Sequence, residues 1–226
     1  MKIKFLFGIA LGMVAVFPAC KKDNYEPPSS ILTGQVVYQS QPIGVRSNGV
    51  QLELWQSGYQ LFSKIPVYIN QEGKFSASLF DGDYKLTQLK GNGPWVDNTD
   101  TINVHVAGAT TVDVPVQPYF VIKSQTIQKS GTTVTATAKV DKIVTTANIE
   151  RVSFYVGSTV LVDANIKEGF DDKTGAALTD LSQPLNFTIT PSAALVAKGY
   201  LYGRVGVKTT GVAEMVYSPV QKIQLQ

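Results

Sequence analysis

Few side chains in this sequence of 226 residues could carry out chemistry, because it contains one histidine, His105, and one cysteine, Cys20. A metal site built from several imidazoles or thiolates is therefore excluded. A serine–histidine–aspartate arrangement would have to use His105. In the stretch TINVHVAG, the apolar Ile102, Val104 and Val106 alternate with polar residues and predict a strand whose apolar face points away from His105. We therefore interpret His105 as a solvated surface residue.

Paired carboxylates are the remaining catalytic option, because glycosidases use two of them. No acidic residue in this sequence stands in a distinguishing context, and a small all-β domain seldom carries a deep cleft. We therefore predict a protein that is not an enzyme, with no catalytic residues, no metal and no cofactor.

The stretch NQEGKFSASLFDGDYKL places Asp81 and Asp83 on either side of a glycine. A calcium site needs about six to eight oxygen ligands, which these two carboxylates cannot supply alone. Asp–Gly is instead a favoured pair for a two-residue hairpin turn. The sequence therefore predicts a β-hairpin here, with Leu79 paired to Tyr84 and its apolar side chains on one face.

A second acidic stretch, residues 163–184, is the longest weakly patterned segment of the chain. Its acidic residues include Glu168, Asp171, Asp172 and Asp180. A long loop inside a compact domain is usually functional or mobile. We interpret this segment as a solvated flexible loop with a tight turn at GFDDKTG, and cation binding is the alternative.

Aromatic residues in turn-rich stretches point to ligand binding. The stretch KGNGPWVDNTDT places Trp95 in a loop of short polar side chains. An indole offers a flat apolar face that suits the apolar face of a sugar ring, and polar neighbours suit the sugar's hydroxyl rim. The alternative is that Trp95 folds back as a lid over a sandwich, where burial would contribute about 2–3 kcal/mol. The polar candidates beside it are Asn92, Asp97, Asn98 and Asp100.

A second aromatic pair lies in LELWQSGYQLF, where Trp55 and Tyr59 flank a turn at Gly58. Because Leu52 and Leu54 share one face of a strand, Trp55 lies on the opposite face or at the strand end. Trp55 and Tyr59 are therefore further candidate sugar contacts, and packing in a core or an interface is the alternative.

The first 20 residues, MKIKFLFGIALGMVAVFPAC, have the pattern of a secretory signal. Two lysines precede an apolar run of about 13 residues, which is shorter than the roughly 20 that a membrane-spanning helix needs. Cys20 after Ala19 resembles the bacterial lipobox, in which the cysteine receives a lipid and becomes the new N-terminus. The resemblance implies a signal peptide at residues 1–19 and a lipid on Cys20. The alternative is an ordinary signal peptide with an incidental cysteine.

Residues 20–30 read as the lipidated cysteine and a short polar tether. Cleavage would leave 18 basic against 17 acidic side chains, so we predict no nucleic-acid partner. No later segment is long and apolar enough to span a bilayer. The acidic residues close to the cysteine resemble the export signals of Bacteroidetes surface lipoproteins, which implies display on the outside of the cell.

The rest of the chain predicts an all-β fold, because period-two alternation dominates and Val, Thr, Tyr and Phe are frequent. Pro115 and Pro118 would interrupt the hydrogen bonds of a central strand and mark a joint. We therefore predict two β-sandwich domains in tandem, residues 31–117 and 118–226. The expected strands are 32–38, 50–55, 65–69, 74–79, 84–89, 101–106, 111–116, 119–127, 132–140, 149–156, 159–162, 185–190, 200–209 and 214–225.

One stretch departs from this strand pattern. TPSAALVAKG predicts a helix of at most two turns, with Thr190 as its N-cap, Pro191 at its first position and Gly199 as its stop.

Two stretches resemble known sandwich domains. EGKFSASLFDGDYKL, with Gly34 upstream, resembles the carboxypeptidase-regulatory-like or transthyretin-like domain. GYLYGRVGVKTTGVAEMVYSPVQKIQL resembles the last strands of a fibronectin type III or immunoglobulin-like domain. Together with YEPPSS, GVRSNGVQLELWQSGY and GNGPW, they resemble the Bacteroidetes lipoprotein family of unknown function 3823 over nearly the whole chain after the signal peptide.

The family has no assigned activity, but its members are similar to ancillary proteins of outer-membrane glycan importers of the starch-utilisation type. The resemblance therefore implies a lipoprotein on the outer membrane, facing the cell exterior, that helps to acquire polysaccharide without being an enzyme. The expected partners are the membrane, a polysaccharide ligand and an importer complex. The alternative is a structural spacer or a docking partner of a transporter or an adhesion assembly.

Overall fold

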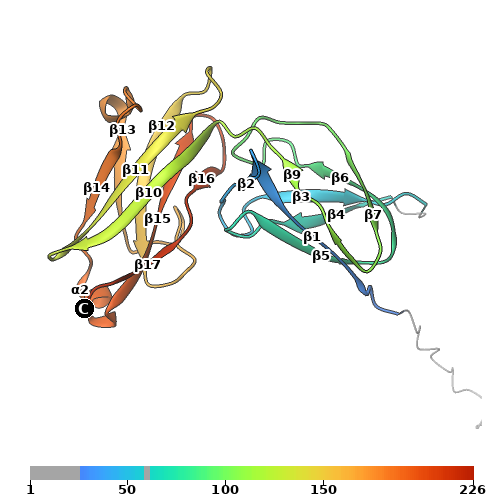
Figure 1. Cartoon of the computed structure of the whole chain (residues 1–226), viewed down its shortest axis with the longest axis horizontal. Coiled ribbons are helices and arrows are strands. Elements are labelled where there is room, and N and C mark those ends of the chain that lie inside the picture. The colour runs from blue at the N-terminus through green and yellow to red at the C-terminus, as the bar shows by residue number, and fades with distance from the viewer. Residues whose placement is uncertain (1–25, 59–61) are drawn as a thin grey trace, which may run out of the picture.

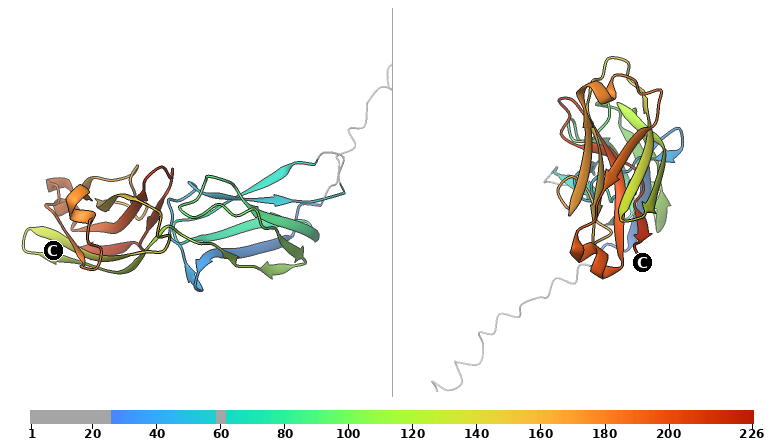
Figure 2. Two further views of the ribbon diagram at one scale, coloured as in Figure 1. Left: turned by 90° about the horizontal axis from the view of Figure 1, so that it is seen from above. Right: turned by 90° about the vertical axis from the view of Figure 1, so that its left-hand side faces the viewer.

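The computed structural model describes residues 26–58 and 62–226, which form two β-sandwich domains arranged end to end (Figures 1 and 2). Cys20 and Tyr59 therefore lie outside the described residues. The prediction of an all-β chain with tandem sandwiches is confirmed.

The first domain packs two sheets face to face. One sheet has the order β2-β1-β5, with β8 and β9 added parallel to β1, and the other has the order β4-β3-β6-β7. The strands are β1 Ser30–Tyr38, β2 Gln41–Pro42, β3 Gln51–Trp55, β4 Lys64–Tyr68, β5 Lys74–Leu79, β6 Gly82–Gln88, β7 Ile102–Val106, β8 Ala109–Thr111 and β9 Val114–Pro115.

The alternating sequence explains how these two sheets enclose a core. Leu52 and Leu54 of β3, together with Leu86 of β6, are at most 1% exposed and face the opposite sheet. The residues between them point outward, because successive side chains of a strand alternate between its faces. The outer face of the β4-β3-β6-β7 sheet is therefore polar, except at the end of β3.

The predicted hairpin at Asp81–Gly82 is wrong, although its buried face is right. Strand β5 pairs with β1 in one sheet and β6 pairs with β3 and β7 in the other, so the turn crosses between the sheets. Leu79 and Tyr84 are both buried in one core, but they lie in different sheets rather than side by side in one. Asp81 holds this turn by accepting a hydrogen bond from the Ser30 hydroxyl at the start of β1.

The second domain is a sandwich of a β10-β11-β14 sheet and a β13-β12-β15-β16 sheet, with β17 also paired to β15. Its core contains Phe154, Phe187 and Leu201, each at most 1% exposed. The elements are β10 Phe120–Ser130, β11 Thr133–Lys142, β12 Ile149–Gly157, β13 Gly169–Thr174, the 3₁₀ helix η1 Gly175–Leu178, β14 Leu185–Ile189, α2 Ala193–Lys198, β15 Tyr200–Thr209, β16 Met215–Tyr217 and β17 Gln221–Gln224.

Two expectations for this domain are wrong. Residues 159–162 form no strand, and the acidic stretch interpreted as a loop contains strand β13. β13 pairs along its whole length with β12. These backbone hydrogen bonds hold it as a strand, although its polar sequence does not predict one.

The short helix is present as α2, but its N-cap differs from the prediction. Ser192 rather than Thr190 caps it by accepting from the Leu195 amide, and Gly199 ends it with a φ of 80°.

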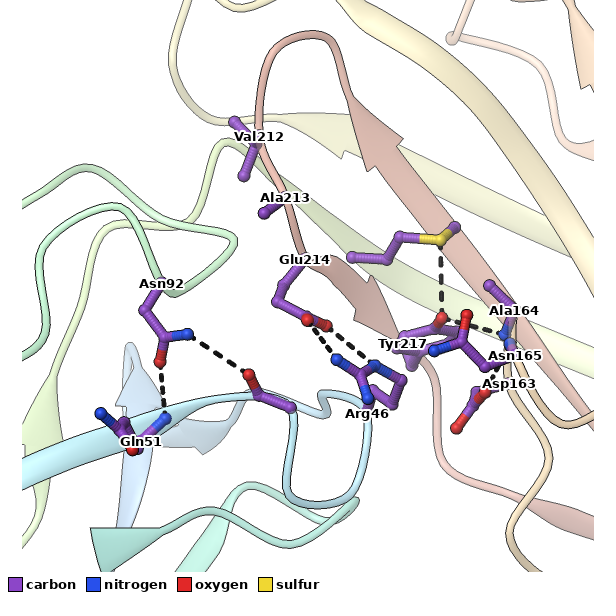
Figure 3. A network of polar contacts seen from close by, with 12 residues as sticks. Arg46, Gln51, Asn92, Asp163, Ala164, Asn165, Val212, Ala213, Glu214 and Tyr217 are labelled. Atoms are coloured by element: carbon purple, nitrogen blue, oxygen red, sulfur yellow. Dashed lines mark hydrogen bonds and ion pairs between the residues drawn. The ribbon is translucent and has the colours of Figure 1, made fainter. Parts of the chain in front are cut away.

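An interdomain joint connects the two sandwiches through side chains and backbone of both (Figure 3). The Tyr217 amide of β16 donates to the Gly44 carbonyl at 2.8 Å, and Val216 packs into the core of the first domain. Arg46 of the first domain forms an ion pair with Glu214 of the second at 2.5 Å, and this bond raises the pKa of the guanidinium. The joint therefore combines apolar packing, a backbone hydrogen bond and an ion pair.

Arg204 of β15 lies at the centre of this joint and is 1% exposed. Its Nε donates to the Ser218 carbonyl at 3.1 Å, and its two Nη atoms donate to the carbonyls of Val45 and Gln71 at 3.4 Å. The guanidinium also lies 4.4 Å from the centroid of the Tyr217 ring. Burial lowers the pKa of Arg204 to about 10, and burial also raises the pKa of the Tyr217 hydroxyl. One buried cation thus binds carbonyls of both domains.

Candidate ligand-binding site

Trp95 does not present its ring to a ligand. It is 3% exposed and belongs to the core of the first domain, where it forms an antiparallel bridge with Pro118. Gly93 lies so close under the indole that a Cβ there would be 2.1 Å from Trp95 Cε2. The interpretation of Trp95 as a sugar-stacking residue is therefore wrong, and the alternative of a lid over the end of the sandwich describes its position.

Asn92 supports the backbone beside this lid rather than a ligand. Its Oδ1 accepts from the Gln51 amide at 2.7 Å, and its Nδ2 donates to the Gly49 carbonyl at 3.3 Å (Figure 3). Both ends of the side-chain amide are thus used to join the loop to the start of β3.

The remaining polar candidates of the loop are exposed but bond within it. Asp97 accepts from the Gly91 amide at 2.7 Å. Asn98 donates to the Asp100 carboxylate at 3.0 Å and accepts from the Asp100 amide at 2.8 Å. With Trp95 buried beneath them, these side chains surround no exposed aromatic face.

Trp55 is the candidate that the structure places at a cavity. It ends β3 on the outer face of its sheet and is partly exposed. Its indole Nε1 donates to the Thr87 hydroxyl at 3.3 Å, which holds the ring against β6. The ring centroid lies 5.3 Å from that of Phe62, whose side chain is 59% exposed. Two aromatic side chains thus form one apolar surface open to solvent.

A cavity of about 440 Å³ opens beside this aromatic pair, on the face of β3, β6 and β7. This volume lies within the range of about 300–1,000 Å³ that is usual for small-ligand pockets. Its side-chain lining includes Trp55, Ser57, Phe62, Lys85, Asn103 and His105. We call it the Trp55 cavity.

The register of the strands explains why these side chains meet. Trp55 pairs with Lys85 of β6, and Lys85 pairs with Asn103 of β7. Directly opposed residues have Cβ atoms about 4.5–5.5 Å apart, so the three side chains form one row across the sheet. The next row places Asp83 beside His105.

The charged groups around the cavity are partly paired. His105 is exposed, as its alternation predicts, and its Nδ1 lies 2.7 Å from the Asp83 carboxylate. On the other side of Trp55, Lys64 forms an ion pair with Glu53 at 2.5 Å. The lining therefore combines an apolar wall with an amide, a hydroxyl and charged groups, which suits a ligand with one apolar face and many polar groups.

The arrangement offers no grouped carboxylates for chemistry. Within residues 26–58 and 62–226, no cluster of three or more histidine, cysteine or acidic side chains could hold a metal ion. In the acidic stretch, Glu168 accepts from the Ser158 amide, Asp171 pairs with Lys173 at 3.0 Å, and Asp180 accepts from the Ser182 amide. These carboxylates stabilise local backbone rather than one shared site.

Sequence reasoning missed Phe62, Lys85 and Asn103. Phe62 follows the turn after Trp55 and could have been found as the third aromatic in LELWQSGYQLF. Lys85 and Asn103 alternate outward on their strands, but only the pairing of β6 between β3 and β7 brings them beside Trp55.

Comparison with known proteins places this two-domain all-β chain in a family. The family model described as "Protein of unknown function (DUF3823) N-terminal domain" matches residues 30–117, and "Domain of unknown function (DUF3823_C)" matches residues 120–222. The chain therefore belongs to the DUF3823 family. A search of curated proteins finds no match to it.

Solved structures share this fold over most of the chain. A DUF3823 family protein from Bacteroides ovatus is 40% identical, with a TM-score of 0.81 over 87% of this chain and 100% of that one. Another from Parabacteroides merdae is 35% identical, with a TM-score of 0.80 over 88% of this chain and 100% of that one. A Bacteroides uniformis structure, described as a "putative carbohydrate binding protein", is 20% identical, with a TM-score of 0.70 over 88% and 100%.

Neither the family descriptions nor those of these structures name an enzymatic activity. In the part of the chain that the structure describes, no helix is long and apolar enough to cross a membrane.

Proposed function

We propose that this protein is a lipid-anchored accessory of the cell surface that binds glycans in the Trp55 cavity without catalysing a reaction. The observation that carries the proposal is the pair of Trp55, partly exposed, and Phe62, exposed, beside a cavity of about 440 Å³ with a polar rim.

The chemistry of the cavity supports a sugar ligand. A pyranose ring has one face of C–H groups that packs on an aromatic ring, and hydroxyl groups at its edge that need hydrogen-bond partners. The rings of Trp55 and Phe62 supply the first surface. The Asn103 amide and the Ser57 hydroxyl, both exposed in the lining, supply partners for the second. The description of the Bacteroides uniformis structure is in keeping with such a ligand.

The anchor in this proposal is a lipid on Cys20, which follows the signal-peptide pattern of residues 1–19. β1 begins at Ser30, only 10 residues later, and a chain of that length reaches at most about 35 Å. Asp81, which binds the Ser30 hydroxyl, is two residues from Asp83 at the rim of the cavity. In this proposal the cavity lies at the end of the first domain nearest the anchor. The export signal resembled by the residues after Cys20 supports an anchor on the outer membrane that faces the cell exterior.

Affinity electrophoresis tests glycan binding directly. The soluble chain from Lys21 is run through gels that contain a panel of polysaccharides, together with its Trp55→Ala variant. We expect retardation by at least one polysaccharide and a loss of most of it in Trp55→Ala. The control is Phe170→Ala, which removes an exposed aromatic side chain from the second domain, away from the cavity. Equal retardation of the wild type and Trp55→Ala would show that the glycan does not bind in the Trp55 cavity. If no polysaccharide retards the wild type, glycan binding itself is contradicted.

A second candidate function, a rigid spacer or docking partner of an outer-membrane importer or adhesion assembly, is favoured by the interdomain joint. Arg204 and the Arg46–Glu214 pair hold the two sandwiches together through contacts that a freely hinged linker would lack. Purification from detergent-solubilised outer membranes separates the two functions. Co-elution with an importer at constant stoichiometry supports the spacer, and elution as a free monomer contradicts it.

A further inference from the structure

We infer that the Trp55 cavity selects an anionic sugar, one that carries a carboxylate or a sulfate, over a neutral sugar of the same shape. The inference rests on the proposed glycan binding and assigns the chemical class of the ligand. Its basis is the Lys85 ammonium group, which lines the cavity beside the aromatic wall.

Lys85 differs from the other charged groups around the cavity because it has no carboxylate partner among the described residues. Lys64 is paired with Glu53 at 2.5 Å, and Asp83 is engaged by His105 at 2.7 Å. Lys85 is exposed on the central strand β6, and no ion pair involving it is formed within residues 26–58 and 62–226. The cavity therefore contains one cation whose charge is available to a ligand.

The position of Lys85 matches the dimensions of a sugar stacked on Trp55. Lys85 is the direct cross-strand neighbour of Trp55 on one side and of Asn103 on the other. Opposed Cβ atoms lie about 4.5–5.5 Å apart, and the lysine side chain is flexible enough to move its ammonium group over that range. A carboxylate or sulfate at the edge of a ring on Trp55 would thus meet the ammonium group and the Asn103 amide.

Asp83 is the charge that opposes this selection, since it lies two residues from Lys85 on the same face of β6. The Asp83 carboxylate lies 2.7 Å from His105 Nδ1 of the edge strand β7, away from Trp55. Lys85 instead lies between Trp55 and Asn103, in the row that the stacked ring would cover. The ammonium group is therefore the nearer charge to the ligand.

Matched pairs of ligands test the inference by isothermal titration with the soluble chain from Lys21. One pair is an oligogalacturonide and its methyl ester, which share a backbone and differ in charge. The other is a sulfated galactan oligosaccharide and its desulfated form. Because an exposed ion pair contributes about a factor of two to five, we expect the anionic member of at least one pair to bind about two- to five-fold more tightly.

Protein variants assign this preference to Lys85. Lys85→Met should abolish the difference within the pair while the neutral member still binds, and Lys85→Arg should retain it. Lys90→Met removes an exposed lysine of the loop before Trp95 and should change nothing. Raising the salt concentration from 50 mM to 500 mM should also reduce the preference, because salt screens exposed charges.

The titration results support or overturn the selection of an anionic sugar as follows. A preference for the anionic member that Lys85→Met removes supports the inference, and the pair that shows it identifies carboxylate or sulfate as the group. Equal binding of both members, or a preference that persists in Lys85→Met, overturns the inference and leaves glycan binding intact. If no glycan in the panel binds to the wild type, the proposed function and this inference fail together.

Discussion

Replacing Arg204 by methionine tests whether one buried cation holds the two domains together. Methionine keeps much of the apolar volume of the side chain but donates no hydrogen bond. The change removes the donor to the carbonyls of Val45, Gln71 and Ser218 and the contact with the Tyr217 ring. Two of these three carbonyls belong to the first domain, so the loss falls on the interdomain joint.

Three contributions determine how much the free energy of unfolding falls in Arg204→Met. Three hydrogen bonds from a charged donor contribute about 1.5 kcal/mol each, at the low end of their range because two of them are long. A desolvated cation–π contact contributes about 2 kcal/mol more. Against this, burial lowers the pKa of Arg204 to about 10, which corresponds to a penalty of about 3 kcal/mol that methionine does not incur. We therefore expect the free energy of unfolding to fall by about 3 kcal/mol.

Urea denaturation followed by two probes measures this loss. Both tryptophans, Trp55 and Trp95, lie in the first domain, so their fluorescence reports that domain alone, whereas far-ultraviolet circular dichroism reports both. We expect the two transitions of the wild type to coincide and those of Arg204→Met to separate. The control is Arg151→Met, which breaks an ion pair with Glu150 on the surface and should cost less than about 1 kcal/mol.

The pKa of Arg204 also predicts how the stability difference between the wild type and Arg204→Met depends on pH. Burial lowers its pKa to about 10 in the folded protein, still above pH 9, so below pH 9 the guanidinium is charged in both the folded and the unfolded chain. No proton is then taken up or released by this group on unfolding, and the difference in stability between the wild type and Arg204→Met should be constant from pH 6 to pH 9. A variant as stable as the wild type, with coincident transitions, would refute the role assigned to Arg204.

Three further predictions concern Trp95, Gly44 and Cys20. Trp95→Ala should lower the free energy of unfolding by about 3–5 kcal/mol, because it empties a core position, and a loss below 1 kcal/mol in urea denaturation would contradict its burial. Gly44→Ala should destabilise the joint, since the new Cβ would lie 2.4 Å from the Tyr217 carbonyl oxygen, and unchanged coincidence of the two probes would show that the backbone can move aside. Mass spectrometry of the native protein should find Cys20 as a lipidated N-terminus, and an unmodified thiol there would contradict the anchor.

The sequence predicts which side chains of a strand face the core, because that depends on neighbouring residues. It does not predict which strands pair, because that depends on residues far away along the chain. Alternation along β5 and β6 correctly assigns Phe75, Leu79 and Tyr84 to the core. The same alternation is satisfied by a hairpin and by a turn that crosses between sheets, because both leave one apolar face. The crossing is decided by β1, which pairs with β5 over six residues from Ser30 to Gln35 and so takes the place of β6.

The site was predicted less well for a related reason. Trp95 and Trp55 both stand beside glycine-containing turns, so local sequence describes them alike. Their exposure depends on what packs against them: Gly93 lies under the Trp95 indole and Pro118 bridges to it, whereas Trp55 is paired with Phe62, which is itself exposed. Strand β13 shows the converse case, in which the polar residues Asp171 and Asp172 join a sheet because β12 offers an unpaired edge.

The cavity and the interdomain joint lie at opposite ends of one strand, and this separation bears on how the protein works. β3 starts at Gln51, five residues after Arg46 of the joint, and ends at Trp55, about 13 Å away at the usual rise per residue. No residue of the second domain lines the Trp55 cavity. The proposed glycan binding would therefore need only the first domain, while Arg204 and the Arg46–Glu214 pair hold the second domain away from the ligand. If so, Trp55→Ala should weaken glycan binding without uncoupling the domains, and Arg204→Met should uncouple them without weakening binding, because distant sites contribute additively. A loss of both properties in either variant would show that the joint and the cavity are coupled.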